Sequence, residues 1–223
     1  MRILLNGACG KMGTTVKEVV RKSYPDIDII PVDIITADGV FRIDDVRDFD
    51  CVIDFSSPDG FISAIKHALR FLKPFVSGTT GIGENEKRLM DDASKKIPVF
   101  YSPNMSIGVN ICFKLVEAIS RQIRCDVYIS EVHHRQKKDK PSGTALRFKE
   151  IVEKNGLFVD IAALRAGDIV GEHEICFVMS GERIILKHTS LTREIFARGA
   201  VEVAKWIINQ RHGLYSFSDM LKL

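Results

Sequence analysis

The first hundred residues of the chain alternate between short, uninterrupted apolar runs and longer segments in which apolar positions recur at helical spacing. Uninterrupted apolar strands that alternate with helices are typical of a parallel sheet covered by helices on both faces. The pattern therefore predicts an α/β domain. Its predicted strands are residues 2–6, 27–32, 51–55, 75–77 and 99–101, and its predicted helices run from a turn at 7–13 to residue 23, over 61–72 and over 84–95.

The pattern changes after Asn104, where we place a domain boundary. Longer stretches of alternating apolar and polar residues replace the short apolar runs, and Ser180-Gly181 between two of them is a hairpin signal. These features indicate a mixed α+β unit. The predicted elements after the boundary are a helix at 107–123, strands at 126–132, 175–179 and 183–188, and an amphipathic helix at 193–210 that Gly213 ends.

The composition is that of an ordinary globular enzyme, with 45% hydrophobic and 27% charged residues. The net charge of +3 is too small to indicate binding to nucleic acid or to a membrane surface. The five cysteines form no Cys-x-x-Cys pair, so neither a metal site nor a disulfide framework is indicated. The first residues do not resemble a signal peptide, and no apolar run approaches the ~20 residues that span a bilayer. We expect a cytoplasmic protein.

A glycine-rich loop between the first predicted strand and its helix indicates a dinucleotide site. It reads Gly7, Ala8, Cys9, Gly10, Lys11, Met12 and Gly13. Glycines there let the backbone approach a pyrophosphate, which the N–H groups at the helix N-terminus then hold. Asp33 lies twenty residues beyond Gly13, where an acidic side chain accepts hydrogen bonds from a ribose. Cys9 replaces the second glycine of the usual motif, and a turn without a ligand is the alternative, but Asp33 favours the cofactor.

A second polar loop follows another predicted strand of the same sheet. It contains Ser77, Gly78, Thr79, Thr80 and Gly81. Ligands of α/β sheets bind at the carboxyl ends of the strands, so this loop is a candidate contact for the nicotinamide ribose. A solvated polar turn is an equally good interpretation of these residues alone.

Residues 131–145 contain the strongest indication of chemistry. His133 and His134 offer an imidazole with a pKa near ~6.5, and Lys137 offers a fixed positive charge. Residues 142–144 resemble the first turn of a helix, whose N–H groups attract an anion. Together they suit a small, multiply negative substrate. A packed histidine, a solvated basic loop and a nucleic-acid patch are the alternatives, and Asp139 within the run and the absence of interleaved aromatic residues argue against the last.

The remaining histidines and the single tryptophan carry no clear functional pattern. His173 and His188 lie in strand patterns, and we expect them to be structural or exposed. His67 and His212 are unremarkable, and Trp206 fits the core face of the last predicted helix.

Several blocks of the chain resemble the 4-hydroxy-tetrahydrodipicolinate reductase (dihydrodipicolinate reductase) family of lysine and diaminopimelate biosynthesis. They run in order over nearly the whole chain, and residues 131–145 are the most specific. The matching blocks are residues 7–13, 54–56, 77–81, 103–110, 131–145, 165–173 and 196–200.

The resemblance implies a role for each matched position. His133 and Lys137 are the implied catalytic pair, and His134, Gly143 and Thr144 the implied substrate contacts. The implied cofactor contacts are Gly7, Ala8, Cys9, Gly10, Lys11, Met12, Asp33, Gly78, Thr79, Thr80, Ser102, Pro103, Asn104 and Met105.

The resemblance also implies a fold and an assembly. Residues 1–103 form a Rossmann-type dinucleotide-binding domain completed by 197–223, and residues 104–196 form an inserted α+β domain that binds substrate and builds a homotetramer. Relative to the family, residues 33–51 and 145–165 are compact, and Lys140 replaces a usually small residue. None of these departures removes a catalytic position.

The implied reaction is hydride transfer from NADH or NADPH to a cyclic dicarboxylate, 4-hydroxy-tetrahydrodipicolinate, with loss of water. The site then needs one acid and fixed cations but no metal. How His133 and Lys137 divide these roles stays open. Another Rossmann oxidoreductase, such as an amino-acid or semialdehyde dehydrogenase, and a non-catalytic nucleotide sensor are the rival functions, but neither explains residues 131–145.

The residues after Asp33 bear on the choice of cofactor. Ile34, Ile35 and Thr36 follow it, with no adjacent arginine. A carboxylate there accepts both ribose hydroxyls of NADH and repels the 2′-phosphate of NADPH. Lys11 or Arg42 could soften this preference, so we expect NADH to be preferred and NADPH to be accepted.

Overall fold

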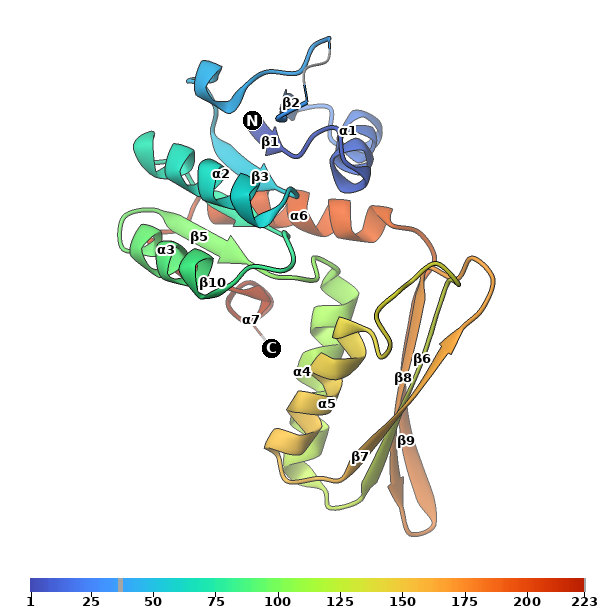
Figure 1. The fold of residues 1–223 in the computed structure, drawn as a ribbon. Helices are drawn as coiled ribbons and strands as arrows, with labels where there is room; N and C mark the ends of the chain where they lie inside the picture. The colour runs from blue at the N-terminus through green and yellow to red at the C-terminus, as the bar shows by residue number, and fades with distance from the viewer. Residues whose placement is uncertain (36–37, 223) are drawn as a thin grey trace. The chain divides into compact units, whose positions relative to one another are not determined.

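The computed structural model describes residues 1–35 and 38–222, which divide into two compact units (Figure 1). The first unit contains Met1–Ser106 and Glu194–Lys222, and the second contains Ile107–Arg193. The first unit is therefore discontinuous in sequence, with the second unit inserted between its two segments. Thr36, one of the residues on which the cofactor preference was argued, lies outside the described residues.

The first unit is a six-stranded parallel sheet in the order β10-β5-β4-β3-β1-β2. Its strands are β1 Arg2–Asn6, β2 Asp28–Val32, β3 Cys51–Asp54, β4 Phe75–Ser77, β5 Pro98–Tyr101 and β10 Gly213–Tyr215. Its helices are α1 Lys11–Ser23, α2 Pro58–Arg70, α3 Glu84–Ser94, α6 Glu194–Ile207 and α7 Phe217–Met220, with a 3-10 turn at Ile43–Asp45.

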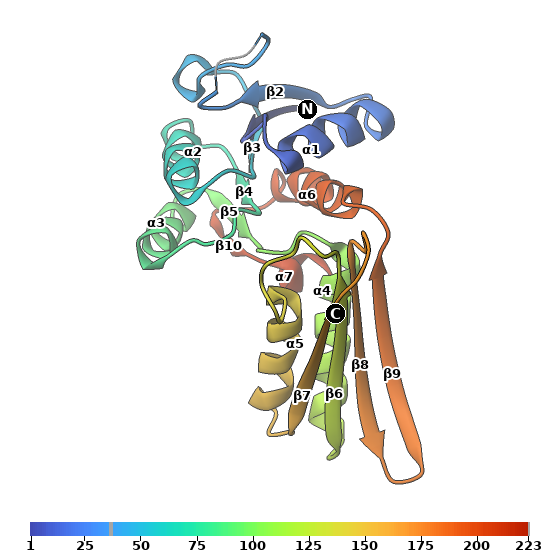
Figure 2. The ribbon, with the colours of Figure 1, turned by 45° about the vertical axis from the view of Figure 1, so that its right-hand side comes forward.

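Helices cover both faces of this sheet, as Figure 2 shows: α2 and α3 lie on one face, and α1 and α6 on the other. The central strands are consequently buried on both sides, and Leu4, Val52, Phe75 and Val99 are all inaccessible to solvent. The apolar runs of the sequence reflect this double burial. The doubly covered α/β fold is confirmed.

Two boundaries in this unit differ from the sequence prediction by three residues. Helix α2 begins at Pro58, three residues before the predicted start, because the Ser57 side chain accepts a hydrogen bond from Gly60 N and proline suits the first helical position. The prediction that Gly213 ends the last helix was wrong. Helix α6 ends at Ile207, and Gly213 begins β10, which pairs with β5 at the sheet edge.

The second unit is a four-stranded mixed sheet in the order β7-β6-β8-β9. Strands β6 and β7 are parallel, whereas β8 is antiparallel to both β6 and β9. Ser180 and Gly181 form the turn of the predicted hairpin, and Gly181 has a φ of +85°. The elements are α4 Ile107–Gln122, β6 Asp126–His133, α5 Gly143–Lys154, β7 Val159–Arg165, β8 Gly171–Met179 and β9 Glu182–Ser190.

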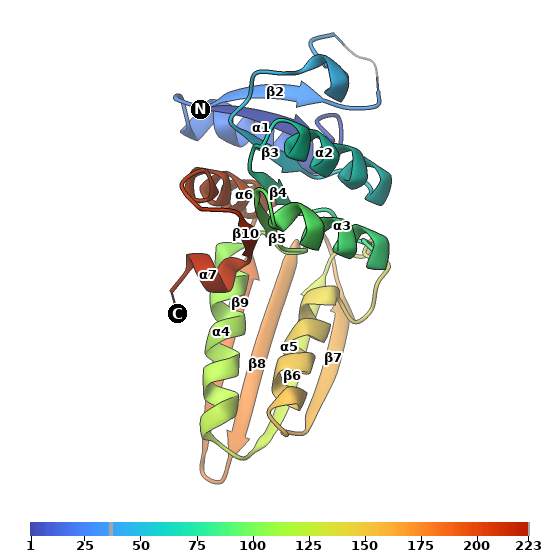
Figure 3. The same ribbon diagram turned by 90° about the vertical axis from the view of Figure 1, so that its left-hand side faces the viewer.

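Helices α4 and α5 cover one face of this second sheet (Figures 1 and 3). The buried residues of the sheet, such as Val127, Ile129, Ile175 and Phe177, pack against them. No helix of the second unit covers the other face within the described residues. Tyr128, Leu164, Val178 and Ile185 are each at least 36% exposed there. None of the helices in residues 1–35 and 38–222 is long and apolar enough to cross a membrane.

Candidate active site

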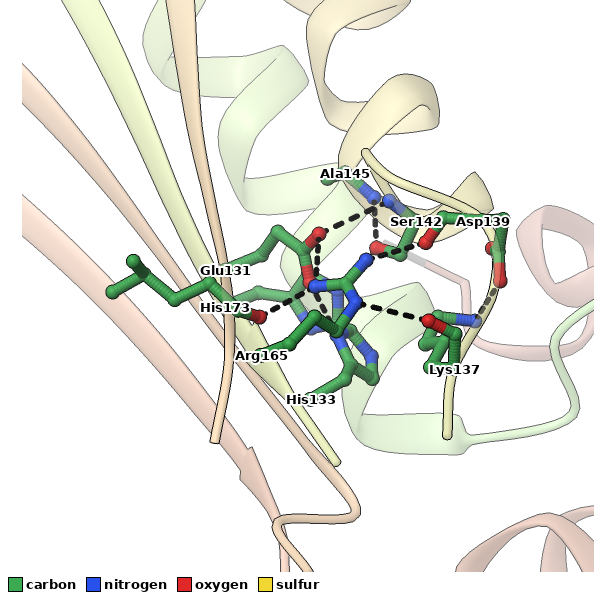
Figure 4. A network of polar contacts seen from close by, with 9 residues as sticks. Glu131, His133, Lys137, Asp139, Ser142, Ala145, Arg165 and His173 are labelled. Atoms are coloured by element: carbon green, nitrogen blue, oxygen red, sulfur yellow. Dashed lines mark hydrogen bonds and ion pairs between the residues drawn. The ribbon is translucent and has the colours of Figure 1, made fainter. Parts of the chain in front are cut away.

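The strand β6 places Glu131 and His133 on the same face of the second sheet, because side chains two residues apart in a strand point the same way. This is the face that α4 and α5 cover. His173 lies opposite Glu131 on β8, and Arg165 lies opposite His133 on β7. Figure 4 shows these side chains gathered with Ser142 and the loop that carries Lys137. Three strands and a loop thus converge at one end of the sheet.

Glu131 is the centre of this group. Its carboxylate is inaccessible to solvent and accepts hydrogen bonds from Arg165 Nη1 at 3.0 Å and from Ser142 N at 3.2 Å, both at Oε1. Its other oxygen contacts Nδ1 of His133. Burying a carboxylate is costly unless it is paired and hydrogen-bonded, and here one cation and two neutral donors satisfy it.

The contact with Glu131 sets the state of the His133 ring. An ionised carboxylate can only accept hydrogen bonds, so Nδ1 of His133 carries the hydrogen. Burial lowers the pKa of His133, whereas the hydrogen bond and the charge of Glu131 raise it. The charges of Lys137 and Arg165 lower it further, and the net result is a decrease. The ring is therefore neutral at pH 7, with Nε2 as its remaining basic atom.

Gly171 provides the space for this ring. A Cβ atom built on Gly171 would lie 2.9 Å from His133 Nε2, closer than such atoms approach in proteins. Gly171 begins β8 on the helix-covered face, beside the end of β6. Any larger residue there would push the imidazole away from its position.

Lys137 lies in the loop between β6 and α5, residues 134–140, which we call the lysine loop. Its Nζ atom is 2.8 Å from Asp139 Oδ1, and its side chain is 24% exposed. Its backbone N–H donates to the carbonyl of His134, which tightens the loop. Nδ1 of His134 is buried and has no hydrogen-bond partner among the described residues.

Helix α5 directs its N-terminus at this group. Ser142 is its N-cap residue: the Ser142 hydroxyl accepts from Ala145 N at 3.2 Å and lies 3.1 Å from His173 Nε2. Gly143 and Thr144 form the first turn, where backbone N–H groups and the helix dipole favour an anion. The predicted substrate contacts His134, Gly143 and Thr144 therefore lie on either side of Lys137 along a single segment.

His173 belongs to this group, although its strand pattern predicted no functional role for it. It is buried, not exposed, and its ring lies 5.1 Å from that of His133 between centroids. Burial and then the charges of His133, His188 and Lys137 lower the pKa of His173 to about 3. The alternation of buried residues from Gly171 to Phe177 could have identified it, had the predicted strand been extended backward from residue 175.

Glu131, His133 and His173 each offer a ligand atom, and these atoms lie within 4.8 Å of one another. The carboxylate, however, already holds three donors, one of them a guanidinium. A cation would have to displace these donors and lie beside the charge of Arg165. The donor set therefore fits a hydrogen-bond network and not a metal centre.

The glycine loop lies in the first unit, between β1 and α1. Gly7 has a φ of +79°, and a Cβ atom there would lie 2.4 Å from the carbonyl oxygen of Phe55, so only glycine fits. The N-cap residue Gly10 supplies no side-chain cap, and the first turn, which contains Lys11 and Met12, has no acidic residue. The end of α1 is thus suited to a phosphate. Of the other two predicted contacts, Ala8 is buried and Cys9 is partly exposed.

Asp33 follows β2 and contacts the same loop. Its Oδ2 atom accepts from Cys9 N at 2.8 Å, and Oδ1 accepts from Ile34 N at 2.8 Å and Ile35 N at 3.3 Å. The backbone N–H of Cys9 therefore fixes the carboxylate beside the glycine loop. A carboxylate has about four acceptor positions, so it can still receive a ribose hydroxyl.

Asp54 is a second buried carboxylate that the sequence did not single out for a role. Its oxygens accept from Asn6 Nδ2 at 2.8 Å, Ser77 Oγ at 2.8 Å and Thr79 Oγ1 at 2.7 Å, and also from Ser56 Oγ. Burial raises the pKa of Asp54, and these four hydrogen bonds oppose the rise. The residue ties together the carboxyl ends of β1, β3 and β4.

The other predicted cofactor contacts lie at the same sheet edge. The hydroxyl of Thr79 donates to Asp54 and accepts from Ser56 N, and its backbone contacts Ser77 Oγ and the Tyr101 hydroxyl, whereas Thr80 is exposed. Ser102 N donates to Ser77 O, which joins the two loops. Gly78 and Asn104 are partly exposed, Pro103 is exposed and Met105 is buried.

Comparison with protein-family models identifies both parts of the chain. The model described as dihydrodipicolinate reductase, N-terminus, matches residues 1–105, and the one described as dihydrodipicolinate reductase, C-terminus, matches residues 108–221. The chain is similar to a 4-hydroxy-tetrahydrodipicolinate reductase of Buchnera aphidicola, with 34% identity over 99% of this chain and 97% of that protein. One from a Nitratiruptor species is 40% identical over 80% of this chain and 79% of that protein.

Solved structures show the same fold. A dipicolinate-bound dihydrodipicolinate reductase from a Paenisporosarcina species superposes with a TM-score of 0.78 at 19% identity, covering 99% of both chains. An aspartate semialdehyde dehydrogenase II from Vibrio cholerae reaches a TM-score of 0.60 at 10% identity, covering 94% of this chain and 98% of that one. At these identities both comparisons concern the fold alone.

Proposed function

The chain belongs to the dihydrodipicolinate reductase family, and we propose that it reduces 4-hydroxy-tetrahydrodipicolinate to tetrahydrodipicolinate in lysine (diaminopimelate) biosynthesis. Members of this family are oxidoreductases that depend on NADH or NADPH. The observation that carries the proposal is the group at the end of the second sheet. There an imidazole, an ammonium and a helix N-terminus lie on consecutive elements, as binding and protonating a dicarboxylate requires.

The residues of the second unit would bind and protonate the substrate. We assign carboxylate binding to His134 and the first turn of α5, which contains Gly143 and Thr144. His133 and Lys137 supply the acid and the fixed cation. A dianionic substrate favours protonation of His133, because its negative charge opposes the lowering of the pKa by burial.

The overall change is loss of water and gain of one hydride and one proton. When bound, the reduced nicotinamide supplies the hydride. The proton comes from the acid, which is His133 or Lys137. Solvent then reprotonates this residue before the next turnover. The residues of the first unit bind the cofactor. The end of α1 holds the pyrophosphate, and Asp33 holds the adenosine ribose.

An assay of cofactor oxidation tests the function. Purified protein is given NADH and substrate generated in situ, and the loss of absorbance at the nicotinamide band is followed. We expect turnover with this substrate and none with aspartate semialdehyde or 2-oxo acids plus ammonia. Turnover with one of these alternatives alone would favour another dehydrogenase, and cofactor binding without any turnover would favour a nucleotide sensor.

A preference for NADH is part of the proposal. The Asp33 carboxylate, fixed beside the glycine loop by Cys9 N, would repel the 2′-phosphate of NADPH. Lys11 and Arg42, both exposed, limit this effect. We expect kcat/KM to be about ten- to a hundredfold higher with NADH, the scale of one lost polar contact plus repulsion. Equal values, or a preference for NADPH, would show that another cation holds the phosphate.

We also assign the uncovered face of the second sheet to a homotetramer. Tyr128, Leu164, Val178 and Ile185 form a partly exposed apolar surface on this face, which another copy of the sheet would bury. Light scattering should report about 100 kDa, four times the 25.0 kDa of one chain. A mass of one chain at micromolar concentration would exclude this assembly.

A cytoplasmic location completes the proposal. All five cysteines are free thiols, and three of them are buried: Cys51, Cys112 and Cys176. A reducing compartment preserves such thiols. Fractionation of cells that produce the protein should place it with cytoplasmic markers, and recovery with periplasmic markers would refute this location.

A further inference from the structure

Two charged residues beside His133 and Lys137 have no assigned role: Glu131 and Arg165. We propose that Glu131 and Arg165 form a positioning pair, which fixes the His133 ring and the backbone of the lysine loop in one arrangement. The inference rests on the proposed function, in which His133 and Lys137 act on the substrate. Neither Glu131 nor Arg165 is assigned any contact with the substrate.

Glu131 orients the imidazole. Its carboxylate has no exposed surface, and it accepts hydrogen bonds from His133 Nδ1, Ser142 N and Arg165 Nη1. These donors belong to a strand, a helix cap and a second strand, so the carboxylate cannot move without losing at least one of them. The position of the His133 ring and the hydrogen on its Nδ1 atom follow from this restraint.

Arg165 restrains the lysine loop. Its Nε atom donates to the Lys137 carbonyl at 3.3 Å and its Nη2 atom donates to the Asp139 carbonyl. Its Nη1 atom donates to Glu131 Oε1 at 3.0 Å. The side chain is only 13% exposed. A guanidinium presents five N–H donors in a rigid plane, so one residue holds two carbonyls and a carboxylate at fixed positions.

The ion pair therefore connects the two acting groups. His133 is held through Glu131, Lys137 is held through the loop backbone, and the Glu131–Arg165 contact joins these two restraints. Removing either partner leaves a buried charge without its counterion, which disturbs both groups at once.

The two partners have opposite electrostatic effects on His133. The groups that face it are Glu131 on its own strand, Lys137 in the loop, Arg165 on β7 and His173 on β8. Glu131 raises the pKa of His133, and Arg165 lowers it. Neutralising Glu131 and neutralising Arg165 should therefore shift the titration of the ring in opposite directions. Loosening of the fold alone would shift it in one direction.

The experiment compares Glu131→Gln, Arg165→Gln and Arg165→Lys with wild type. Glu150→Gln and Arg147→Gln are the matched controls, because these residues form an exposed ion pair on α5 at 2.8 Å in the same unit. Turnover, KM for NADH and the thermal midpoint are measured for each variant. The titration of His133 is followed by NMR of the imidazole nitrogens, a measurement that does not depend on activity.

We expect kcat to fall about 10- to 100-fold in Glu131→Gln and Arg165→Gln, the scale of a misplaced catalytic group. KM for NADH should stay unchanged. His133 should titrate at lower pH in Glu131→Gln and at higher pH in Arg165→Gln. Arg165→Lys should keep the wild-type titration and lose turnover, because an ammonium keeps the charge but cannot reach three acceptors. The control variants should match wild type.

Each result has a separate meaning. Unchanged titration of His133 in both charge-removing variants, or a shift in the same direction, overturns the positioning pair. So does wild-type turnover in Arg165→Lys. If wild type itself does not turn over, the proposed function fails, and the NMR titration still decides the pair. If the Gln variants do not fold, Arg165→Lys, which keeps the charge, provides the test.

Discussion

Lys137 differs from its neighbour Lys138 in its surroundings, and the difference leads to a prediction. Lys137 is partly buried and pairs with Asp139, whereas Lys138 is exposed. Changing Lys137 to Ala should lower turnover by roughly 10²-fold or more, the scale of a positioned proton donor. Cofactor affinity, measured by fluorescence of bound NADH, should hardly change. The control Lys138→Ala should match wild type. Near-normal turnover of Lys137→Ala would mean that the basic run is a solvated loop without a catalytic role.

His173 makes stability depend on pH. Its pKa falls from 6.5 in the unfolded chain to about 3 in the folded one, chiefly through burial. As pH falls below 6.5, the unfolded chain therefore binds a proton that the folded chain does not, and stability decreases. The loss due to this group should be about 2 kcal/mol at pH 5.

Urea unfolding between pH 5 and pH 8 measures this effect. His173→Gln should lose part of the pH dependence of stability. The control His212→Gln, at an exposed position, should keep all of it. If His173→Gln kept the full wild-type slope, the proton uptake would belong to another group.

The site was predictable to the extent that its residues are close in sequence. His133, Lys137 and Ser142 fall within ten positions, so the sequence alone associates them. Arg165 and His173 reach the site only through strand pairing, opposite His133 and Glu131. The residue types alone do not specify which strands become neighbours or in which register. For that reason, His173 was interpreted as structural or exposed, and Arg165 had no role.

At the scale of elements, strong apolar patterns determined which segments were found. The predicted strands at 2–6 and 75–77 have the bounds of β1 and β4, because each has an apolar centre next to polar residues that mark its end. Strand β10 has three residues, too few to display a period, and its pairing with β5 depends on tertiary structure. After the buried Val159, strand β7 alternates only between half-buried and exposed positions, so its pattern was weak.

The cap of helix α5 has two functions that can be separated. Ser142 caps the helix and also contacts His173, whereas Ser57 only caps α2, with Gly60 N at 3.2 Å. Each change to Ala should lower the free energy of unfolding by about 1 kcal/mol. We expect Ser142→Ala to reduce turnover as well, because it removes the hydroxyl that contacts His173, whose ring packs against that of His133. Unfolding curves and the NADH assay measure both effects, and equal turnover in the two variants would contradict this coupling.

At the scale of the whole molecule, the uncovered face of the second sheet predicts how the assembly can be broken. Ile185 lies on this face and is 55% exposed. Ile185→Glu should dissociate the proposed tetramer, because a buried unpaired carboxylate is costly. Leu72→Glu, at a 69% exposed position of the first unit, is the control. Sedimentation of both variants measures their mass, and a tetramer of Ile185→Glu would place the interface elsewhere.

The discontinuous first unit has a consequence for folding during synthesis of the protein. Its sheet needs α6, whose Ala197, Val201 and Ala204 are fully buried, and it needs β10 beside β5. Both come from Glu194–Lys222, which the ribosome makes only after the whole second unit. At about 5–20 residues per second, the part of the sheet that α6 covers and the β5 edge stay uncovered for roughly 5 to 25 s. Chaperones that bind nascent chains would bind these uncovered apolar residues during this interval. The inserted second unit can fold before the first unit is complete.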